Sequence, residues 1–485
     1  MKRRLALVLA LASACALNPV TGRPEFVVIS SERERELGAE QETKFLAELG
    51  LSDHEPTSSW VEAIGARLAE HSPRQDVTYR FHVVDLDVPN AFALPGGPVF
   101  VTRGLLALVR SEDELAGVIG HEIGHVAARD SVRQTTAATP LALVFGVPAA
   151  IVGSVSRPLG ALVGLPGAIV SGLALSAYGR EQEYQADEVG AELALAAGFR
   201  PMALAEFLER LEREEALHRD GPPPLSFFAS HPRTPDRTER VREYARELAP
   251  RARPRSKADL SVALAHLDGL LVGPSPLHGV FVEDDFFHPE LGFAFRVPQG
   301  WDRENQPEAV VAADPTAGGH VAILLELAGE GDDPLAVATG ELASEEHQRA
   351  LHTLEVNGRP ATQLEIGSGT DAALLTWLAL GGRVYRVVGV YPLAEAQARR
   401  PEIAAAVESL RPLTKRDRAR VRAERLRIRS AQPGESLDAL LARNQSAWTA
   451  AETAVANDLD AEAPLAAGVR IKVAVAEPWT APAPR

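Results

Sequence analysis

One short motif constrains this chain more than any other: Gly-His-Glu-Ile-Gly-His at residues 120–125. The surrounding stretch, residues 111–129, has apolar residues at helical spacing and begins with the Ser-x-x-Glu pattern typical of a helix N-terminus. His121 and His125 are four residues apart, so a helix places both imidazoles on one face. Two imidazoles at this spacing can bind one zinc ion, and Glu122 can accept a proton from a water at that metal. The competing interpretation is a buried helix with two hydrogen-bonded histidines.

A catalytic zinc site needs a third protein ligand and an open position. Residues 178–198 form a second strong helical candidate, which a Gly and then a Pro terminate. Within it, Glu183 and Asp187 are four residues apart and share one face. We expect Glu183 to be the third zinc ligand and Asp187 to accept a hydrogen bond from a ligand histidine. The alternative is a solvated acidic helix face, because further acidic residues lie in the same stretch.

With these two helices in place, the sequence resembles a known family. It is similar to the zinc metallopeptidases related to HtpX and the CAAX-prenyl protease, and within them to the secreted, BepA-like and Oma-like branch. The resemblance covers about residues 18–250. The matching segments, in chain order, are residues 90–97 running into 99–106, the zinc helix motif at 121–125, the Glu-x-x-Ala-Asp motif at 183–187, and Ser230-His231-Pro232 with Arg237.

The resemblance implies a mainly helical, gluzincin-type peptidase domain over residues 31–250, with a small β-hairpin or sheet. It also implies that the strand Asn90, Ala91, Phe92 and Ala93 borders the cleft, where an extended peptide substrate could pair with its edge. Pro89-Asn90 and Pro95-Gly96 could equally be turn residues without a role in binding.

The resemblance further implies catalytic roles for His231 and Arg237. His231 would either fill the fourth zinc position or stabilise the oxyanion, although spacing alone would make a His before Pro a turn residue. Arg237 would pair with a nearby carboxylate or with a substrate carbonyl.

The N-terminus has the pattern of an exported protein. Residues 2–4 are basic, residues 5–11 are apolar but too short for a stable membrane span, and Ala12-Ser13-Ala14 precedes the single cysteine, Cys15. This resembles a bacterial lipobox, so we expect a signal peptide at 1–14 and a lipidated segment at 15–30 that attaches the protein to the outer membrane. The alternative is a plain secretory signal cleaved after Ala14.

Residues 134–156 and 158–179 contain no charged side chain, and each run is long enough to cross a bilayer. Several Pro and Gly residues interrupt both runs, and a lipidated protein does not need a span. We therefore favour a helical hairpin that covers the active site or lies on the membrane surface. An integral-membrane hairpin is the alternative.

The rest of the chain predicts two further domains. After a linker at 251–285, alternating apolar residues predict an α+β accessory domain at 286–412 that carries no catalytic motif. A linker at 413–425 leads to residues 426–476, which resemble a LysM-type carbohydrate-binding module with strand-helix-helix-strand order. A tail follows at 477–485. The resemblance implies peptidoglycan as a partner of this module.

The overall prediction is an α+β multidomain, lipid-anchored zinc endopeptidase of the bacterial envelope that degrades misfolded or misassembled proteins on the periplasmic side. The net charge of −16, with no offsetting basic face, argues against nucleic acid as a partner. Two rival hypotheses remain: a wall-anchored chaperone or binding protein with weak or latent activity, and an integral-membrane protease of the HtpX type.

Overall fold

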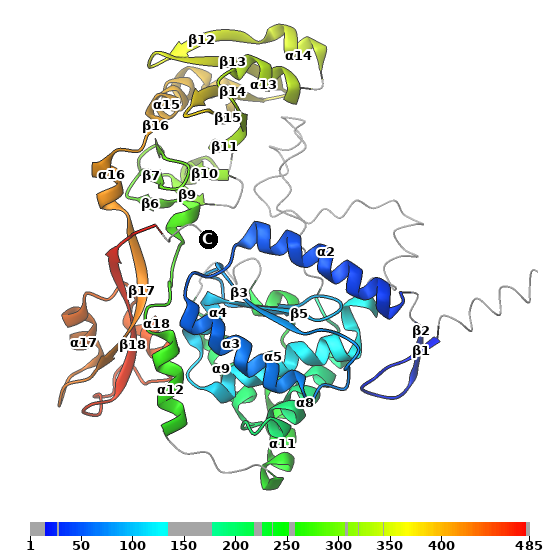
Figure 1. Ribbon diagram of the computed structural model, residues 1–485. Helices are drawn as coiled ribbons and strands as arrows, with labels where there is room; N and C mark the ends of the chain where they lie inside the picture. The colour runs from blue at the N-terminus through cyan, green and yellow to red at the C-terminus, as the bar shows by residue number, and fades with distance from the viewer. Residues whose placement is uncertain are drawn as a thin grey trace, which may run out of the picture. The chain divides into compact units, whose positions relative to one another are not determined.

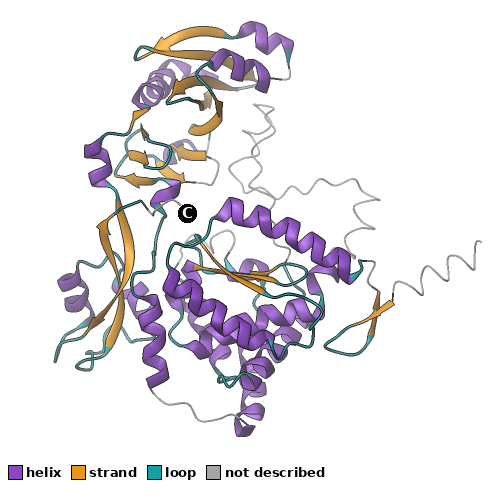
Figure 2. Cartoon of the chain, in the orientation of Figure 1, coloured by secondary structure: helices purple, strands orange, loops and turns teal. Residues whose placement is uncertain are grey.

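The computed structural model describes residues 15–26, 29–133, 177–217, 226–234, 236–251, 258–305, 309–318, 320–342 and 344–481. They divide into two compact units, and both helices and strands are abundant, in agreement with the expected α+β class. In the first unit helices surround a small sheet, whereas strands dominate the second unit (Figure 1, Figure 2).

Of the described residues, the first unit takes 15–26, 29–133, 177–217, 226–234, 236–251, 258–273 and 423–477. Its described elements are β1 (Cys15–Leu17), β2 (Pro24–Phe26), α2 (Ser31–Leu49), α3 (Glu55–Ala69), β3 (Arg80–Val84), β4 (Ala91–Ala93), β5 (Pro98–Thr102), α4 (Arg103–Leu108), α5 (Glu112–Ala128), α8 (Arg180–Ala196), α9 (Ala203–Glu215), α10 (Phe227–Ser230), α11 (Arg237–Leu248), α12 (Ala258–Leu267), β17 (Arg422–Ser430), α17 (Leu437–Asn444), α18 (Ala450–Asn457) and β18 (Arg470–Pro478).

The small sheet has the order β3-β5-β4, in which β5 pairs with β3 in parallel and with β4 as an antiparallel hairpin. The hairpin turn needs glycine at Gly97, because φ is 119° there and a Cβ would lie 2.4 Å from the Thr78 carbonyl oxygen. Helix α2 lies along this sheet (Figure 1), and its Gly38 packs so closely that a Cβ would meet the Pro95 carbonyl oxygen at 1.8 Å.

The hydrophobic core of the first unit forms around α5. The buried side chains of Leu115, Ile119 and Ile123 on this helix belong to one cluster with residues of α3, α4, α8 and α9. The same cluster includes Leu426 and Ala474 from the C-terminal strands. The chain's last elements therefore complete the core that supports α5.

The described elements can be compared with the domain boundaries expected from the sequence, which stay a prediction. The expected linker at 251–285 contains α12 and β6 (Val280–Val282), and the one at 413–425 contains α16 (Lys415–Arg420) and the start of β17. β17, α17, α18 and β18 follow the strand-helix-helix-strand order expected at 426–476 and share a hydrophobic cluster of their own, while residues 423–477 group with the first unit. The physical reason is strand pairing over long sequence distance, since Gly269 N donates to Leu426 O and Leu426 N donates to Leu270 O, each at 2.8 Å. Composition alone does not reveal such pairing.

A buried lysine strengthens this attachment. Lys472 of β18 is fully buried, and its Nζ donates to the carbonyl oxygens of Ala107 at 2.7 Å and Val109 at 2.8 Å. Burial lowers the pKa of Lys472 well below its usual range. Because Val109 lies two residues before Ser111, the N-cap of α5, the C-terminal strands are fixed to the start of that helix.

The second unit contains a seven-stranded antiparallel sheet with the order β12-β13-β14-β15-β11-β10-β9. It also contains a four-stranded sheet with the order β16-β8-β7-β6. Two hydrophobic clusters form on the seven-stranded sheet; one includes α15 and the other includes α13. Its elements are β6 (Val280–Val282), β7 (Asp285–His288), β8 (Phe293–Arg296), β9 (Asp302–Asn305), β10 (Ala309–Ala313), β11 (Ala322–Glu330), α13 (Pro334–Glu341), α14 (Glu345–Ala350), β12 (His352–Val356), β13 (Arg359–Ser368), β14 (Asp371–Leu380), β15 (Arg383–Pro392), α15 (Ala396–Ser409), β16 (Arg411–Pro412) and α16 (Lys415–Arg420).

Candidate metal centre

Helix α5 presents two histidines to one buried point. Ser111 caps the helix by accepting a hydrogen bond from Glu114 N, while the Glu114 carboxylate accepts from Arg110 N. The Nε2 atoms of His121 and His125 lie 3.1 Å apart, and both side chains are buried.

Helix α8 packs directly on α5 because small residues line the contact. A Cβ on Gly120 would lie 3.0 Å from Gly190 O, and one on Gly124 would lie 3.0 Å from the Ala186 Cα. This close approach brings the carboxylate of Glu183 to the two histidines, with 3.4 Å between Glu183 Oε1 and His125 Nε2.

His231 completes the group. It follows the short helix α10, and its Nδ1 lies 3.2 Å from His121 Nε2 and 3.1 Å from Glu183 Oε1. Its ring stacks on Phe227 with 4.4 Å between centroids, and its backbone N donates to Phe227 O. The four candidate ligand atoms all lie within 4.8 Å of one another.

This donor set fits a zinc ion. Ligand atoms at ordinary Zn–N and Zn–O distances in a tetrahedron are separated by roughly 3.3–3.5 Å. Five of the six pairs of these residues have donor atoms 3.1 to 3.7 Å apart. Three imidazoles and one carboxylate form a combination that suits zinc better than the all-oxygen sites of magnesium or calcium.

Two aspartates orient the ring nitrogens that face away from this point. Asp187 Oδ1 lies 2.8 Å from His121 Nδ1, and Asp130 Oδ2 lies 2.8 Å from His125 Nδ1. A proton on each Nδ1 leaves the lone pair of each Nε2 directed at the shared point. Asp130 is itself held by Gln182 at 2.9 Å.

Arg237, at the first position of α11, joins two of the carboxylates. It donates from Nε and Nη2 to Asp187, each at 2.9 Å, and its Nη1 lies 2.5 Å from Glu183 Oε2. Burial opposes a charge on Arg237, yet these carboxylates raise the pKa of its guanidinium above the usual value. Burial by itself would raise the pKa of Glu183, but the neighbouring histidines and Arg237 hold that pKa well below the usual carboxyl range.

Glu122 lies beside this group without a partner. Its side chain is fully buried, and neither carboxylate oxygen has a hydrogen-bond partner among the described residues. The nearest nitrogen of the group, His231 Nε2, lies 3.5 Å from Oε1. A buried, unsatisfied carboxylate is costly, and such a group is typical of a site that handles a proton.

Comparison with known proteins decides the family. The model of peptidase family M48 matches residues 55–245. A Protease HtpX homolog of Thermococcus sibiricus is 32% identical over 208 residues, which cover 35% of this chain and 69% of that protein. The chain belongs to peptidase family M48. Zinc is the metal of this family, and the buried group His121, His125, Glu183 and His231 could hold such an ion in this chain.

Two other relatives of this M48 chain have informative names. The mitochondrial metalloendopeptidase OMA1 of Schizosaccharomyces pombe is 29% identical over 235 residues, covering 47% of this chain and 66% of that protein. The β-barrel assembly-enhancing protease of Escherichia coli K12 is 26% identical over 196 residues, covering 40% of each chain. The chain thus spans less than two thirds of the length of both relatives.

Two residues of the M48 site were not recognised in the sequence. Asp130 lies just past the end of α5, five residues after His125, and that short distance after the motif was its only signal. Tyr178 stacks on the His125 ring with 3.8 Å between centroids, and its hydroxyl lies 3.1 Å from Ser131 Oγ. No sequence pattern indicated this stacking.

The strand expected to contact substrate is β4, an edge strand of the described sheet. Asn90 N donates to Thr102 Oγ1, and the residues Ala91, Phe92 and Ala93 are buried, with Phe92 stacked on Phe100 at 4.9 Å. Pro89 O accepts a hydrogen bond from Phe227 N, so the strand is tied to the segment that carries His231.

Several expectations fall outside the described part of the chain. These are the signal peptide at 1–14 and residues 134–176 of the uncharged hairpin. The backbone of Cys15 is described and pairs with Phe26 in β1 and β2. Within the described ranges, no helix has the length and hydropathy needed to cross a membrane.

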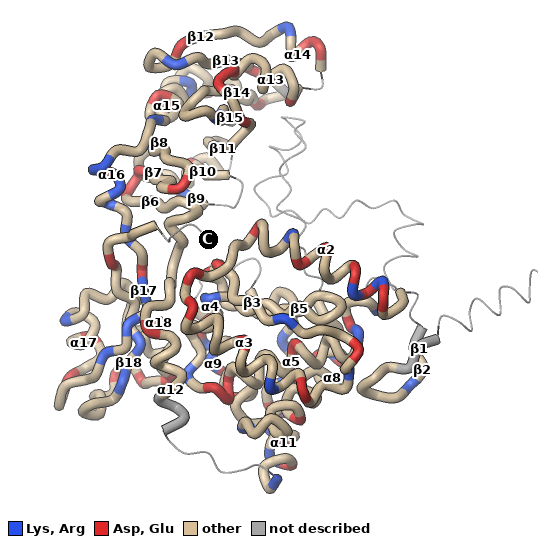
Figure 3. The backbone as a smooth tube through the Cα atoms, viewed as in Figure 1, with Lys and Arg blue, Asp and Glu red and all other residues tan. Residues whose placement is uncertain are grey.

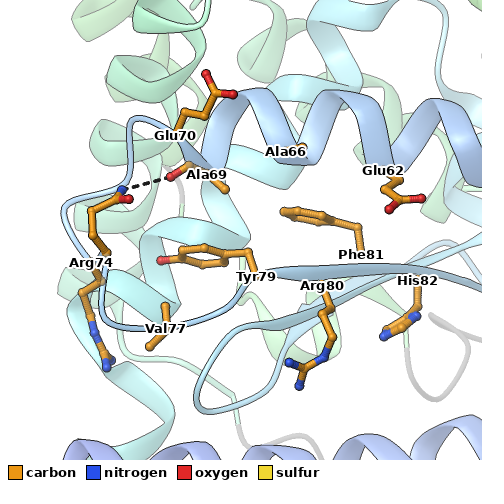
Figure 4. A pocket seen from close by; sticks show the side chains of 11 residues that line it. Glu62, Ala66, Ala69, Glu70, Arg74, Val77, Tyr79, Arg80, Phe81 and His82 are labelled. Carbon is orange, nitrogen blue, oxygen red and sulfur yellow. Dashed lines mark hydrogen bonds between the residues drawn. The ribbon is translucent and has the colours of Figure 1, made fainter.

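A pocket of about 690 Å³ lies between α3 and β3, away from the four-residue group. Figure 4 shows Tyr79 and Phe81 of its wall on the side of α3, whereas Arg80 and His82 point to the opposite side. None of the candidate ligands lines it, so we assign it no part in the metal chemistry.

Proposed function

We propose that this chain is a zinc-dependent endopeptidase that hydrolyses peptide bonds of misfolded or misassembled proteins in the bacterial cell envelope. The observation that carries the proposal is the buried carboxylate of Glu122, which accepts no hydrogen bond within the described residues and lies directly beside the four converging donors. A carboxylate in this position serves as a general base for hydrolysis.

In this proposal His121, His125 and Glu183 hold zinc, which would polarise a peptide carbonyl and make a water molecule more acidic. Glu122 accepts the proton of the attacking water and then donates it to the leaving amine. Asp187 and Asp130 keep the two α5 imidazoles in the tautomer with a free Nε2. Arg237 balances the charge of Glu183 and Asp187.

The substrate class rests on the E. coli relative, whose name describes a protease that enhances β-barrel assembly. By analogy, the substrates of this chain are unfolded or misassembled envelope proteins. The lipobox-like N-terminus supports attachment through a lipidated Cys15 to the periplasmic face of the outer membrane. The LysM-like pattern of residues 426–476 supports peptidoglycan as a second partner.

A direct test uses purified protein and an unfolded substrate such as reduced, carboxymethylated α-lactalbumin. Cleavage that a chelator abolishes and stoichiometric zinc restores is the expected result. Binding of the unfolded protein without any cleavage would favour the chaperone alternative.

The anchoring part of the proposal has its own test. Replacing Cys15 with Ser should release the mature protein from the membrane fraction, because one lipid anchor supplies the attachment. A Cys15→Ser protein that stays in the membrane through salt washes would favour the integral-membrane alternative.

A closed form of the same enzyme is a second candidate function, favoured by the position of His231. With Nδ1 of His231 among the other donors, a fourth protein ligand fills the position that a catalytic water needs. The chain would then be a latent protease until the segment carrying His231 moves.

A further inference from the structure

Helix α2 carries one carboxylate that is buried against the peptidase core. Glu34 accepts hydrogen bonds from Arg74 Nη1 at 2.7 Å and from Arg129 Nε at 2.8 Å. The exposed fractions of these residues are 1% for Glu34, 2% for Arg74 and 8% for Arg129. Buried charges are retained where their partners hold a specific geometry, and removing one partner leaves the others uncompensated.

Arg129 occupies an unusual backbone position. It is the C-cap of α5, with φ 59° and ψ 34°, the left-handed conformation in which glycine is the usual residue. An arginine here accepts backbone strain that a glycine would avoid. The side chain explains why arginine rather than glycine occupies this position, because it binds Glu34 and also donates from Nη2 to Ile29 O at 2.8 Å.

The residue that follows Arg129 orients a candidate metal ligand. Asp130 accepts a hydrogen bond from His125 Nδ1 at 2.8 Å, so the turn at Arg129 determines where that carboxylate lies. Arg74 adds a second link to this end of α5, with Nη1 3.4 Å from Val126 O. Glu34 is therefore linked to His125 by two hydrogen bonds, Glu34–Arg129 and Asp130–His125, which the peptide bond between Arg129 and Asp130 joins.

A second side chain of α2 binds the small sheet. Glu42 binds Arg80, with three contacts of 2.5 to 3.0 Å, and His82 at 2.7 Å. Arg80 and His82 point together to the side of β3 opposite α3 (Figure 4). Charged residues occur along much of the helix (Figure 3), and within it Glu34 is the buried one of them.

We propose that Glu34 is a positioning residue for the metal centre: it holds Arg129 in its left-handed turn, and that turn presents Asp130 to His125. This inference rests on the proposed zinc chemistry and extends it, because it makes metal retention depend on the N-terminal helix. Contacts behind a metal ligand typically change metal affinity by about 10- to 100-fold when removed.

The test measures the rate at which zinc-loaded, full-length protein loses its metal to a colorimetric chelator. Glu34→Gln should lose zinc about tenfold faster than wild type. Glu32→Gln is the matched control, since it makes the same change at an exposed position of the same helix and should leave the rate unchanged. Equal rates for wild type and Glu34→Gln would overturn the proposal.

A further control separates faster zinc loss from a general loss of stability. Leu211→Ala removes a buried side chain of α9 from the same core, and it should lower thermal stability without accelerating zinc loss to the same extent. If Leu211→Ala protein of comparable melting temperature releases zinc as fast as Glu34→Gln protein, Glu34 has only a general structural role.

A double-mutant cycle tests the route. Arg129→Gly keeps the left-handed turn but removes the side chain that binds Glu34, so adding Glu34→Gln to it should change the zinc release rate little further. Fully multiplicative effects would contradict a route through Arg129. A wild-type protein that binds no zinc would overturn the proposed function as well, whereas normal zinc binding with unaltered Glu34→Gln kinetics would overturn only this inference.

Discussion

Gly190 of α8 lies directly against His121 of α5: a Cβ on Gly190 would come within 2.8 Å of the His121 backbone nitrogen. The obstacle is backbone rather than a flexible side chain, so it cannot rotate away. The separation of these two helices therefore sets how closely Glu183 approaches the two α5 histidines.

Replacing Gly190 with Ala should push α8 from α5 and reduce zinc binding. Overpacking of this kind typically costs about 1–3 kcal/mol. Gly340→Ala is the control, because Gly340 lies in helix α13 with open space around its Cα and should be neutral or slightly stabilising. Zinc content per chain and thermal unfolding measure both effects; full zinc content in Gly190→Ala protein would contradict this account of the helix contact.

Replacing Lys472 with Met should destabilise the first unit. The change keeps the aliphatic stem but leaves the carbonyl oxygens of Ala107 and Val109 without this donor, at a cost of about 2–4 kcal/mol. Lys415→Met makes the same change at an exposed position and should have little effect. Denaturant unfolding measures the difference, and equal stability of the two variants would show that the C-terminal strands are not fixed in this way.

Removing the metal should lower the stability of the first unit specifically. A ligand present at about 1,000 times its Kd stabilises the folded state by about 4 kcal/mol. For a unit of this size that corresponds to a shift in Tm of roughly 10 °C. Within the described residues the second unit contains no comparable donor group, so its transition in scanning calorimetry should stay in place. A chelator that shifts neither transition would argue against tight zinc binding.

Much of the site could be predicted from the sequence because its residues lie at helical spacing. His121 and His125, and separately Glu183 and Asp187, are four residues apart; the structure brings the first three to one point and places Asp187 behind His121, at its Nδ1. The N-cap Ser111 was also readable from a local pattern. His231 came only from the family resemblance, since nothing local distinguishes it from a turn residue.

The remainder depends on contacts that local patterns do not encode. Asp130 and Arg129 lie at the end of α5, and Tyr178 comes from a segment distant in the sequence. Their contacts with His125 and Glu34 produce no periodic pattern in the sequence. The domain boundaries of the C-terminal half stay a prediction for the same reason, because the hydrogen bonds between residues 269–272 and β17 join segments that lie far apart in the sequence.

Replacing His231 with Ala separates its two possible roles. If His231 closes the site as a fourth ligand, the variant keeps zinc through the other three ligands and cleaves an unstructured protein faster than wild type. If it stabilises the oxyanion, zinc content is unchanged and cleavage is slower. Steady-state cleavage and metal analysis of the purified variant distinguish the two, and no change in either would leave His231 as a structural turn residue.

The central claim is that Glu122 is the proton acceptor of a zinc-dependent hydrolysis, and the most direct measurement compares Glu122→Gln with Glu183→Ala and wild type. Each protein is assayed for zinc per chain and for cleavage of the unfolded substrate under identical conditions. Glu122→Gln should retain zinc and lose nearly all turnover, because only the proton acceptor is changed. Glu183→Ala should lose zinc affinity as well. Near-normal cleavage by zinc-loaded Glu122→Gln protein would contradict the proposed mechanism.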